Sequence, residues 1–350
     1  MKKIDVLILG DFPPATHTGI SMVNALVRDI LNEQGRAVHI IDESAWVYKG
    51  IKRALHYLLG SHFSLLKFLL SYRTKYVYLN IPLSAAGQVR LFLTCLWVKL
   101  FSPHSAIIGH IHRGDIFYWA AKSLFNRFIF RLNLSFFRQV VVLSKKFEAD
   151  LSSIFPKTNT VVIPNTSLLE GMGTRETFIY KNRFICISNF IRTKGVGDLI
   201  DAFADERLRQ YHLKVFGNVY DLGFYEELKK TKTSNVELIP NPDRKSLLKW
   251  LSDTDCLILP SWNEGQPLVI LEAMSLGVPA IATNVGDIPN MLGANYPFLF
   301  VPQNREMLKK KIIHFSEYND KQGLSKELLS RYSSNYSRKL FENNIKQLFR

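Results

Sequence analysis

Two glutamates lie on either side of an expected strand-to-helix turn. Glu264 is in a loop with glycine and proline that follows the apolar run 256–259, and Glu272 comes eight positions later. A helix that opens at Pro267 would place Glu272 about one and a half turns inside it, while Glu264 stays on the loop. Ionised carboxylates accept hydrogen bonds from hydroxyl groups. The pair could therefore bind hydroxyls at opposite ends of one long ligand.

The start of this helix offers a second kind of binding group. Backbone N–H groups in the first turn of a helix have no partner within the helix, and the helix dipole favours negative charge there. Gly265, Gln266, Pro267 and Leu268 occupy this position. Their backbone would face a crevice and suit an anion or a polar ring.

Two histidines, His110 and His112, alternate at the end of an expected strand, so both side chains should point to the same face. A histidine pair with this spacing could suggest a metal site. However, the local pattern places no third cysteine, histidine or acidic ligand beside them. We therefore predict no metal site here.

Alternating strands and helices must position these groups. Apolar runs bounded by loops predict strands, and apolar residues at helical spacing predict helices between them. This alternation is typical of an α/β protein with parallel sheets. The expected strands are 4–9, 36–41, 76–80, 105–111, 139–143, 183–188, 213–216, 236–239, 256–259 and 278–282. Helices are expected after 4–9 and at 195–205, 221–232, 243–252, 267–276, 304–316 and in the final segment.

The length of 350 residues suggests two domains. The linker-like segment 163–178 interrupts the alternation and predicts the boundary between them. Doubly wound sheets bind ligands at the carboxyl ends of their strands, so the cleft between two such domains is the expected site.

These features resemble the family 4 glycosyltransferases, which are retaining enzymes of the GT-B fold. The most specific signal is the Glu-x7-Glu spacing within EGQPLVILEAMSLGVPAIATNVGDIP, which begins at Glu264. The segments PPATHTG, HIHRGD, VVLSKKFEADL, IPN and SNFIRTKG occur in the family's order over most of the chain. The resemblance implies an N-terminal acceptor-binding Rossmann-like domain (1–165), a C-terminal nucleotide-sugar-binding Rossmann-like domain (166–331), and a final helix, 332–350, that crosses back to the N-terminal domain.

The resemblance also implies roles for individual residues. Glu264 would hold hydroxyls of the donor sugar, and Glu272 would hold the ribose of the nucleotide. The backbone of residues 265–268 would bind around the diphosphate and sugar. Lys194, in the sequence TKG, would neutralise the diphosphate and stabilise charge that develops only as the glycosidic bond breaks.

Two positions depart from the family pattern. The family usually has an arginine five residues before the lysine, where this chain has Asn189, and Arg192 could supply the missing charge from the same loop. Gly19 matches the glycine that lets the backbone approach the diphosphate. The family normally has two glycines there, whereas this chain has Thr18 and Gly19.

The resemblance places a histidine beside the donor sugar, and His112 fits that position better than His110. Its role would be hydrogen bonding to the sugar or acceptor. Asp115 either binds the acceptor or pairs with a neighbouring arginine. No DxD metal motif follows a strand in the proper context, so helix N-termini and cations would replace a divalent metal, and no cofactor is expected.

The composition excludes several classes of protein. With 47% hydrophobic and 21% charged residues, the chain can form packed cores and is not globally disordered. Its three cysteines are far apart, which excludes a disulfide framework and fits a reducing, cytoplasmic compartment. The start, MKKIDVLILG, predicts a strand rather than a signal peptide because Asp5 interrupts the apolar run. No stretch reaches the roughly 18 apolar residues needed to span a bilayer.

Positive charge is concentrated in the segment 44–146. This segment holds fifteen Lys and Arg residues and one acidic residue, and so carries almost all of the chain's net charge of +15. It is also rich in aromatic residues, as in KGIKRALHYLLGSHFSLLKFLLSYR. An anionic membrane surface attracts such a segment. A solvated basic face over a core is the alternative, and nucleic-acid binding is the third interpretation, although no nucleic-acid module is recognisable.

From the resemblance we predict a retaining, metal-independent glycosyltransferase that moves a sugar from a nucleotide diphosphate sugar to a hydroxyl of a glycan or lipid-linked acceptor. Its setting would be cell-surface polysaccharide or lipopolysaccharide synthesis, at the cytoplasmic face of the membrane. A non-catalytic sugar-nucleotide or glycan-binding protein of the same fold is the alternative, and the asparagine at position 189 keeps it open. A nucleotide-sugar epimerase fits the Glu-x7-Glu segment less well.

Overall fold

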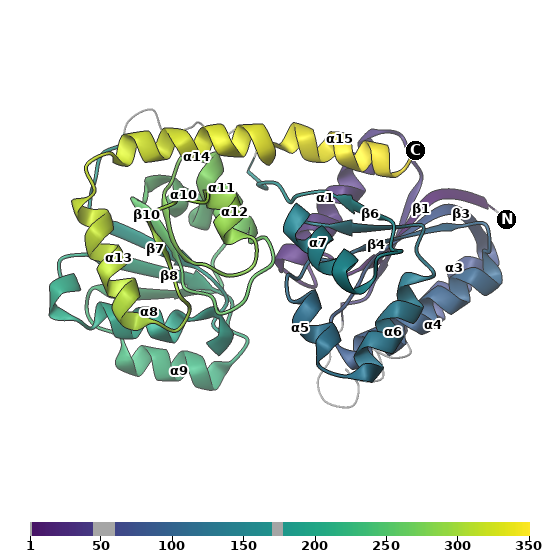
Figure 1. Cartoon of the computed structure of the whole chain (residues 1–350), viewed down its shortest axis with the longest axis horizontal. Coiled ribbons are helices and arrows are strands. Elements are labelled where there is room, and N and C mark those ends of the chain that lie inside the picture. The colour runs from purple at the N-terminus through teal and green to yellow at the C-terminus, as the bar shows by residue number, and fades with distance from the viewer. Residues whose placement is uncertain (1, 45–59, 170–177) are drawn as a thin grey trace. The chain divides into compact units, whose positions relative to one another are not determined.

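The chain forms two compact units, each built on one parallel sheet (Figure 1). The computed structural model describes residues 2–44, 60–169 and 178–350. Unit 1 comprises Met1–Asn165 and Lys339–Arg350, and unit 2 comprises Thr166–Arg338. The chain thus returns to unit 1 at residue 339, later than the expected start of the returning helix at 332. The reason is that residues up to 335 belong to a separate helix, α14 (Lys321–Asn335), which packs on unit 2.

The sheet of unit 1 has the strand order β2-β1-β3-β4-β5-β6, and all neighbouring strands are parallel. The chain moves from β1 outward to β2 in one direction and from β3 outward to β6 in the other. The strand order therefore reverses between β1 and β3, which marks the expected ligand position at their carboxyl ends. The strands are β1 (Lys2–Gly10), β2 (Val38–Asp42), β3 (Tyr72–Asn80), β4 (Ala106–His110), β5 (Gln139–Val142) and β6 (Thr160–Val162).

Helices pack on both faces of this sheet because side chains alternate along each strand. Val77 and Leu79 point into a core shared with one layer of helices. Tyr76 and Tyr78 point to the opposite face, where both rings contact Phe349. The first layer comprises α3 (Ser61–Ser71), α4 (Ala85–Phe101), α5 (Ile116–Ala121), α6 (Leu124–Leu134) and α7 (Lys145–Ile154).

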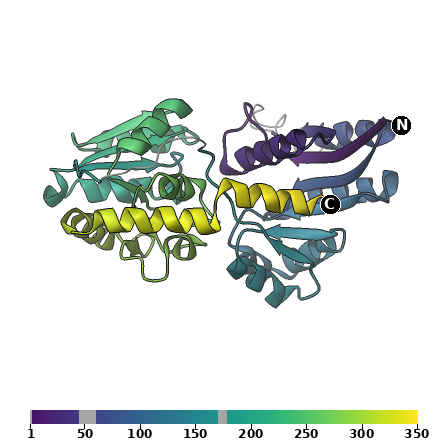
Figure 2. The same cartoon turned by 90° about the horizontal axis from the view of Figure 1, so that it is seen from above.

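The second face of the unit 1 sheet carries α1 (Gly19–Glu33) and α15 (Arg338–Leu348), which lie side by side in Figures 1 and 2. The hydroxyl of Tyr76 donates a hydrogen bond of 2.6 Å to the carbonyl oxygen of Arg350. Phe349 is fully buried. The last residues of the chain therefore complete the core of the first unit.

The sheet of unit 2 has the parallel order β12-β11-β10-β7-β8-β9, which reverses between β7 and β10. The loops after β7 and β10 consequently meet at the carboxyl edge of this sheet. Its strands are β7 (Arg183–Ile187), β8 (His212–Gly217), β9 (Val236–Pro240), β10 (Cys256–Leu259), β11 (Ala280–Thr283) and β12 (Leu299–Phe300).

Helices also surround the second sheet. They are α8 (Val196–Phe203), α9 (Leu222–Thr231), α10 (Arg244–Asp253), α11 (Leu268–Ser275), α12 (Ile288–Leu292), α13 (Arg305–Glu317) and α14, with short 3-10 turns η2 (Arg192–Lys194) and η3 (Glu206–Leu208). Every strand and helix expected from the sequence overlaps an observed element. The short strands β6 and β12 were not expected, and the sequence analysis assigned no ranges to α3 to α7, α12 or α14. None of the described helices combines the length and the apolar character needed to cross a membrane.

Candidate active site

Lys194 and Glu264 form an ion pair at the point where the strand order of unit 2 reverses. Lys194 ends η2, which follows β7, and Glu264 lies on the loop that follows β10. Lys194 Nζ lies 2.6 Å from Glu264 Oε1. Both side chains are mostly buried, with 28% and 12% of their surface exposed. The two principal residues of the sequence prediction are therefore in direct contact.

The loops that carry this ion pair are held together by their backbones. The N–H of Trp262 donates a hydrogen bond of 2.9 Å to the carbonyl oxygen of Thr193. Gly195 has a φ of +68°, and a Cβ on this residue would lie 2.0 Å from the carbonyl oxygen of Pro260. Only glycine combines a positive φ with so close an approach. The glycine that follows Lys194 is therefore what allows the two loops to meet.

A third loop, after β11, supports Glu264 from the other side. Gly286 has a φ of +58°, and a Cβ there would lie 2.2 Å from the carbonyl oxygen of Glu264. The N–H of Asp287 donates to the carbonyl oxygen of Gly265 at 2.9 Å. Asp287 Oδ2 also accepts a hydrogen bond of 2.8 Å from Gln266 Nε2. The sequence analysis gave Gly286 and Asp287 no role; their only signal was the Gly-Asp pair near the end of the Glu264 segment.

Helix α11 begins at Leu268, with Pro267 as its N-cap residue, one residue later than expected. Among the described residues, no side chain caps this end of the helix. Its first N–H groups therefore keep their capacity to bind an anion. Glu272 is the fifth residue of α11 and is 5% exposed, so this carboxylate is far more enclosed than a surface glutamate.

Arg192 and Asn189 are engaged elsewhere. The guanidinium of Arg192 pairs with Glu227 on α9 at 2.5 Å and lies 4.8 Å from the ring centre of Phe224. Asn189 Oδ1 accepts a long hydrogen bond of 3.4 Å from the N–H of Asn218. In this conformation Arg192 does not join the ion pair of Lys194.

Unit 1 has its own polar cluster where its strand order reverses. Gly10 ends β1, Asn80 ends β3, and a Cβ on Gly10 would lie 2.6 Å from Asn24 Nδ2 and 2.7 Å from Asn80 Nδ2. Asn80 Oδ1 lies 2.9 Å from His112 Nε2. The predicted His112 is therefore held by an asparagine that the sequence analysis did not identify, because 32 residues separate the two.

The rings of His110 and His112 lie against each other, as their alternation predicted, with ring centres 3.9 Å apart. His110 is fully buried; its Nδ1 bonds to the hydroxyl of Tyr78, and its Nε2 has no hydrogen-bond partner among the described residues. Burial, together with the neighbouring His112, holds the pKa of His110 well below its usual value. Burial also lowers the pKa of His112 to about 3, although the residue as a whole is only partly buried. Both imidazoles are consequently neutral near pH 7.

Two more predicted residues have clear positions in unit 1. Gly19 is exposed and is the first residue of α1, where Thr18 and Ser21 form a capping box. Asp115 pairs with Arg113 at 2.5 Å, which matches one of its two expected roles.

A buried ion pair that the sequence analysis missed lies near the end of β2. Arg90 Nη1, from α4, contacts Glu43 Oε1 at 2.7 Å, and about a tenth of each side chain is exposed. Burial raises the pKa of Glu43, and the charge of Arg90 opposes that shift. No sequence pattern indicates this pair, since 47 residues separate the partners.

The described residues contain no group of three or more His, Cys, Asp or Glu side chains arranged to hold a metal ion. The groups that could bind an anionic ligand are instead Lys194 and the start of α11, while Glu264, Glu272 and His112 could hydrogen-bond to hydroxyl groups.

Comparison with known proteins identifies the second unit. Residues 176–335 match the family described as glycosyl transferases group 1. Over 224 residues the chain is 26% identical to the uncharacterised glycosyltransferase MJ1178 of Methanocaldococcus jannaschii, which covers 61% of this chain and 59% of that protein. It is 25% identical over 190 residues to the amylovoran biosynthesis glycosyltransferase AmsD of Erwinia amylovora, which covers 53% of each chain. The matches thus span between about half and three-fifths of these relatives.

The fold of the whole chain is also known. The structure of Anabaena Alr3699/HepE in complex with UDP and glucose superimposes with a TM-score of 0.69, covering 98% of this chain and 99% of that one at 16% identity. At this identity the likeness establishes the fold, which is GT-B with two Rossmann-like domains.

Proposed function

Because residues 176–335 belong to the glycosyl transferases group 1 family and the chain has the GT-B fold, we propose that this protein is a retaining glycosyltransferase. It transfers a sugar from a nucleotide diphosphate sugar to a hydroxyl of a glycan or lipid-linked acceptor. The observation that carries the proposal is the ion pair of Lys194 and Glu264 at the carboxyl edge of the second sheet.

The ion pair holds two groups that would bind different parts of a nucleotide sugar: Lys194 the diphosphate and Glu264 the sugar hydroxyls. Transfer breaks the bond between the anomeric carbon and a diphosphate oxygen while the acceptor oxygen forms a bond to that carbon. Negative charge grows on the leaving oxygen, which takes up the proton of the acceptor hydroxyl. Lys194 stabilises this charge as it develops. Glu264 accepts hydrogen bonds from hydroxyls of the sugar. Without donor, each side chain holds the other in position; with donor, the diphosphate replaces Glu264 as the partner of the ammonium group.

The rest of the donor lies along α11 in this proposal. The uncapped N–H groups at Leu268 and Val269 bind the diphosphate, and their position at the positive end of the helix dipole adds to the attraction. Gln266, fixed by Asp287, shapes the loop around the sugar. Glu272 binds the ribose hydroxyls. The lysine and the helix end supply the positive charge, so the reaction proceeds without a divalent metal or other cofactor.

Acceptor recognition belongs to unit 1. Asn80 Oδ1 accepts a hydrogen bond from the N–H at Nε2 of His112, which leaves Nδ1 of His112 as a hydrogen-bond acceptor. A neutral imidazole of this kind orients a sugar or acceptor hydroxyl. With a pKa of about 3, His112 is too weak a base to remove a proton from an alcohol.

The acceptor and location are part of the same proposal. AmsD is named for the biosynthesis of a polysaccharide, which supports a polymer or its lipid-linked precursor as the acceptor. The basic residues of unit 1 support action at an anionic membrane surface on the cytoplasmic side.

Purified protein tests the proposal in two steps. Thermal unfolding with UDP, GDP, ADP and CDP and their common sugar conjugates should reveal one preferred nucleotide, because a ligand at about 100 times its Kd stabilises the protein by about 2.7 kcal/mol. Release of that nucleotide diphosphate from its sugar conjugate should then be lost in Glu264→Ala and Lys194→Ala. Lys229→Ala, an exposed cation on α9, is the matched control and should keep full activity. Equal activity in all four proteins would contradict the proposal.

The asparagine at position 189 supports a second candidate, a sugar-nucleotide-binding protein without transfer activity. The expected arginine is absent there, and Arg192 is paired with Glu227, so this loop directs one cation, Lys194, at the diphosphate position. This candidate predicts normal nucleotide stabilisation with no release of nucleotide diphosphate, either by transfer or by hydrolysis.

A further inference from the structure

One layer of helices in unit 1 exposes an unusual number of large apolar side chains. Of the eighteen exposed large hydrophobic residues among those described, eleven lie on α3 to α6. We call their outward surface the α3–α6 face. Its apolar members are Phe63, Leu70, Val89, Leu93, Leu100, Phe101, Phe117, Tyr118, Leu124, Phe125 and Phe128.

These side chains form stripes rather than isolated points. On α4, Val89, Leu93 and Leu100 repeat at helical spacing, opposite the buried Leu91, Cys95 and Val98 that face the sheet. Helix α4 packs beside both α3 and α6, and α6 packs beside α5. The four helices thus lie in one layer, and their outward stripes belong to one surface.

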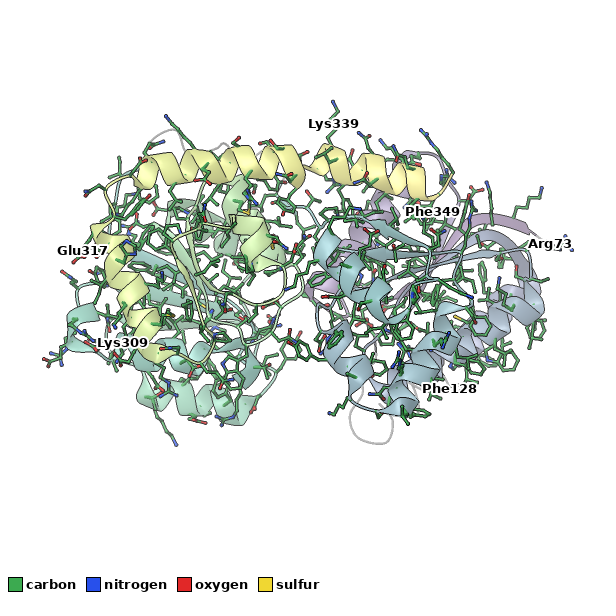
Figure 3. All side chains as sticks on the ribbon, viewed as in Figure 1. Arg73, Phe128, Lys309, Glu317, Lys339 and Phe349 are labelled. Atoms are coloured by element: carbon green, nitrogen blue, oxygen red, sulfur yellow. The ribbon has the colours of Figure 1, made fainter. Side chains whose placement is uncertain are left out.

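The most exposed part of this face is the α5–α6 corner. Leu124 is 86% exposed, Tyr118 79% and Phe128 64%. Figure 3 shows Phe128 on the outer side of unit 1, away from its sheet. Helix α5 begins four residues after His112, so this corner adjoins the carboxyl end of β4 where His112 lies.

Cations surround the same corner and have no acidic partner. Lys122, Arg127 and Arg131 are exposed, and none of them forms an ion pair with another described residue. Lys67 on α3 and Lys99 on α4 add charge along the face. The single acidic residue between 60 and 147, Asp115, is already paired with Arg113. The first cations of the basic segment, Lys49, Lys52 and Arg53, lie outside the described residues.

We propose that the α3–α6 face is a docking surface for an anionic phospholipid bilayer, with the α5–α6 corner inserted between the headgroups. Moving exposed leucine and phenylalanine side chains from water to the acyl boundary is favourable because it buries apolar surface. The unpaired cations bind the phosphates of anionic lipids. The inference deepens the proposed use of a lipid-linked acceptor, because docking brings the His112 end of unit 1 to the membrane surface.

Charge disfavours a symmetric dimer through this face. A two-fold interface places the same patch on both partners, so Lys122, Arg127 and Arg131 of each copy would face those of the other with no acidic residue to offset them. A nucleic acid would match the cations but would leave the aliphatic side chains, such as Leu124, without a partner. An anionic bilayer satisfies both kinds of side chain.

Vesicle co-sedimentation of the full chain tests the surface. The wild-type protein should bind vesicles that contain about one-third phosphatidylglycerol at least tenfold more tightly than pure phosphatidylcholine, and added salt should weaken this binding. Leu124→Ser with Phe128→Ser should weaken binding at least tenfold. Arg127→Gln with Arg131→Gln should weaken it about tenfold or more and reduce the dependence on salt.

Two matched control pairs come from unit 2. Leu222→Ser with Val301→Ser removes two exposed apolar side chains, and Lys229→Gln with Lys230→Gln removes two cations from α9. Both should bind vesicles as the wild type does. Equal binding to neutral and anionic vesicles without salt dependence, or unchanged binding of the Leu124/Phe128 variant, would overturn the proposal. So would a wild-type dimer in sedimentation that this variant converts to a monomer.

The test does not depend on catalysis. Thermal stabilisation by the preferred nucleotide should be the same in the wild type and all the surface variants, since the donor groups are in the other unit. Loss of vesicle binding with intact nucleotide binding therefore supports the surface. Vesicle binding without any nucleotide response would contradict the proposed function and leave the docking surface standing.

Discussion

Asn80 determines which nitrogen of His112 carries the proton. Its side-chain oxygen lies 2.9 Å from His112 Nε2 and can only accept, so Nε2 must donate and Nδ1 remains an acceptor. Asn80 ends β3, and His112 lies just beyond the end of the adjacent parallel strand β4. The pair is therefore at the carboxyl edge of the first sheet, beside the point where the strand order reverses.

This relationship predicts a change in pH dependence for Asn80→Asp. In the wild type His112 stays neutral above a pKa of about 3, so its titration adds no step to the kcat/KM profile between pH 5 and 9. A carboxylate at position 80 favours the imidazolium and raises the pKa of His112. A new step should therefore appear, with activity rising as pH increases and the ring loses its proton. Asn80→Ala is the control; it should lower activity without creating a step.

Lys194 should matter far more for turnover than for stability. Lys194→Ala removes the cation that stabilises the leaving diphosphate, and kcat should fall about 100- to 1,000-fold. The melting temperature should change by only a few degrees, because the pair is partly exposed. Steady-state kinetics and calorimetry on the same preparation measure both. A large loss of stability with unchanged kcat would mean that the pair is structural.

Lys194→Ala and Glu264→Ala should not be additive if the two side chains act as one unit. The double variant should lose less than the product of the two single losses in kcat/KM, because each residue depends on the other for its position. If the loss in kcat/KM of the double variant equals the product of the two single losses within about twofold, the contact has no role in the reaction.

Gly195→Ala and Gly286→Ala should both destabilise the second unit by several kcal/mol. Each substitution adds a Cβ within 2.2 Å of a backbone oxygen at a residue with positive φ. Gly35→Ala is a matched control, because Gly35 also has a positive φ, +71°, but no atom of the residues that the structure describes lies within 4 Å of its Cβ position. It should cost only about 1 kcal/mol. Urea unfolding measures all three, and equal losses would refute the close-approach argument.

The buried Glu43 predicts a stability difference that grows with pH. Its pKa is raised in the folded state by burial, so the folded protein holds this proton more tightly than the unfolded chain, where the usual value is 4.5. The wild type therefore loses this contribution as pH rises from 4.5 through the raised pKa. Glu43→Gln does not titrate. Its free energy of unfolding, minus that of the wild type, should increase over this range; a flat or falling difference would contradict the raised pKa.

Local sequence patterns predicted most of the strands, the helices of the second unit that flank the proposed site, and the local positions of two proposed site residues. Apolar runs predicted the strands, and the Glu-x7-Glu spacing placed Glu264 and Glu272 on the loop and helix where they lie. The contact between Lys194 and Glu264 follows from strand order, because β7 and β10 become neighbours only when the sheet reverses. No local pattern encodes that reversal.

The remaining site residues depend on contacts between distant segments. Asn80 supports His112 across 32 positions, and Arg90 finds Glu43 across 47. The direction of Arg192 was also unpredictable, since its partner Glu227 is on a helix 35 residues away. These polar residue types are also common on protein surfaces without such partners, so the residue type alone does not predict the contact. Tertiary packing decides which of them are brought together.

The burial of Phe349 against Tyr76 and Tyr78 has a consequence for synthesis on the ribosome. Unit 2 is one continuous stretch of chain and can acquire its core once residue 338 has emerged. Unit 1 is translated first, yet the part of its sheet that Phe349 covers, beside α1, stays exposed until α15 has been translated. The rings of Tyr76 and Tyr78 in the nascent chain therefore lack their contact with Phe349 until that residue has been translated.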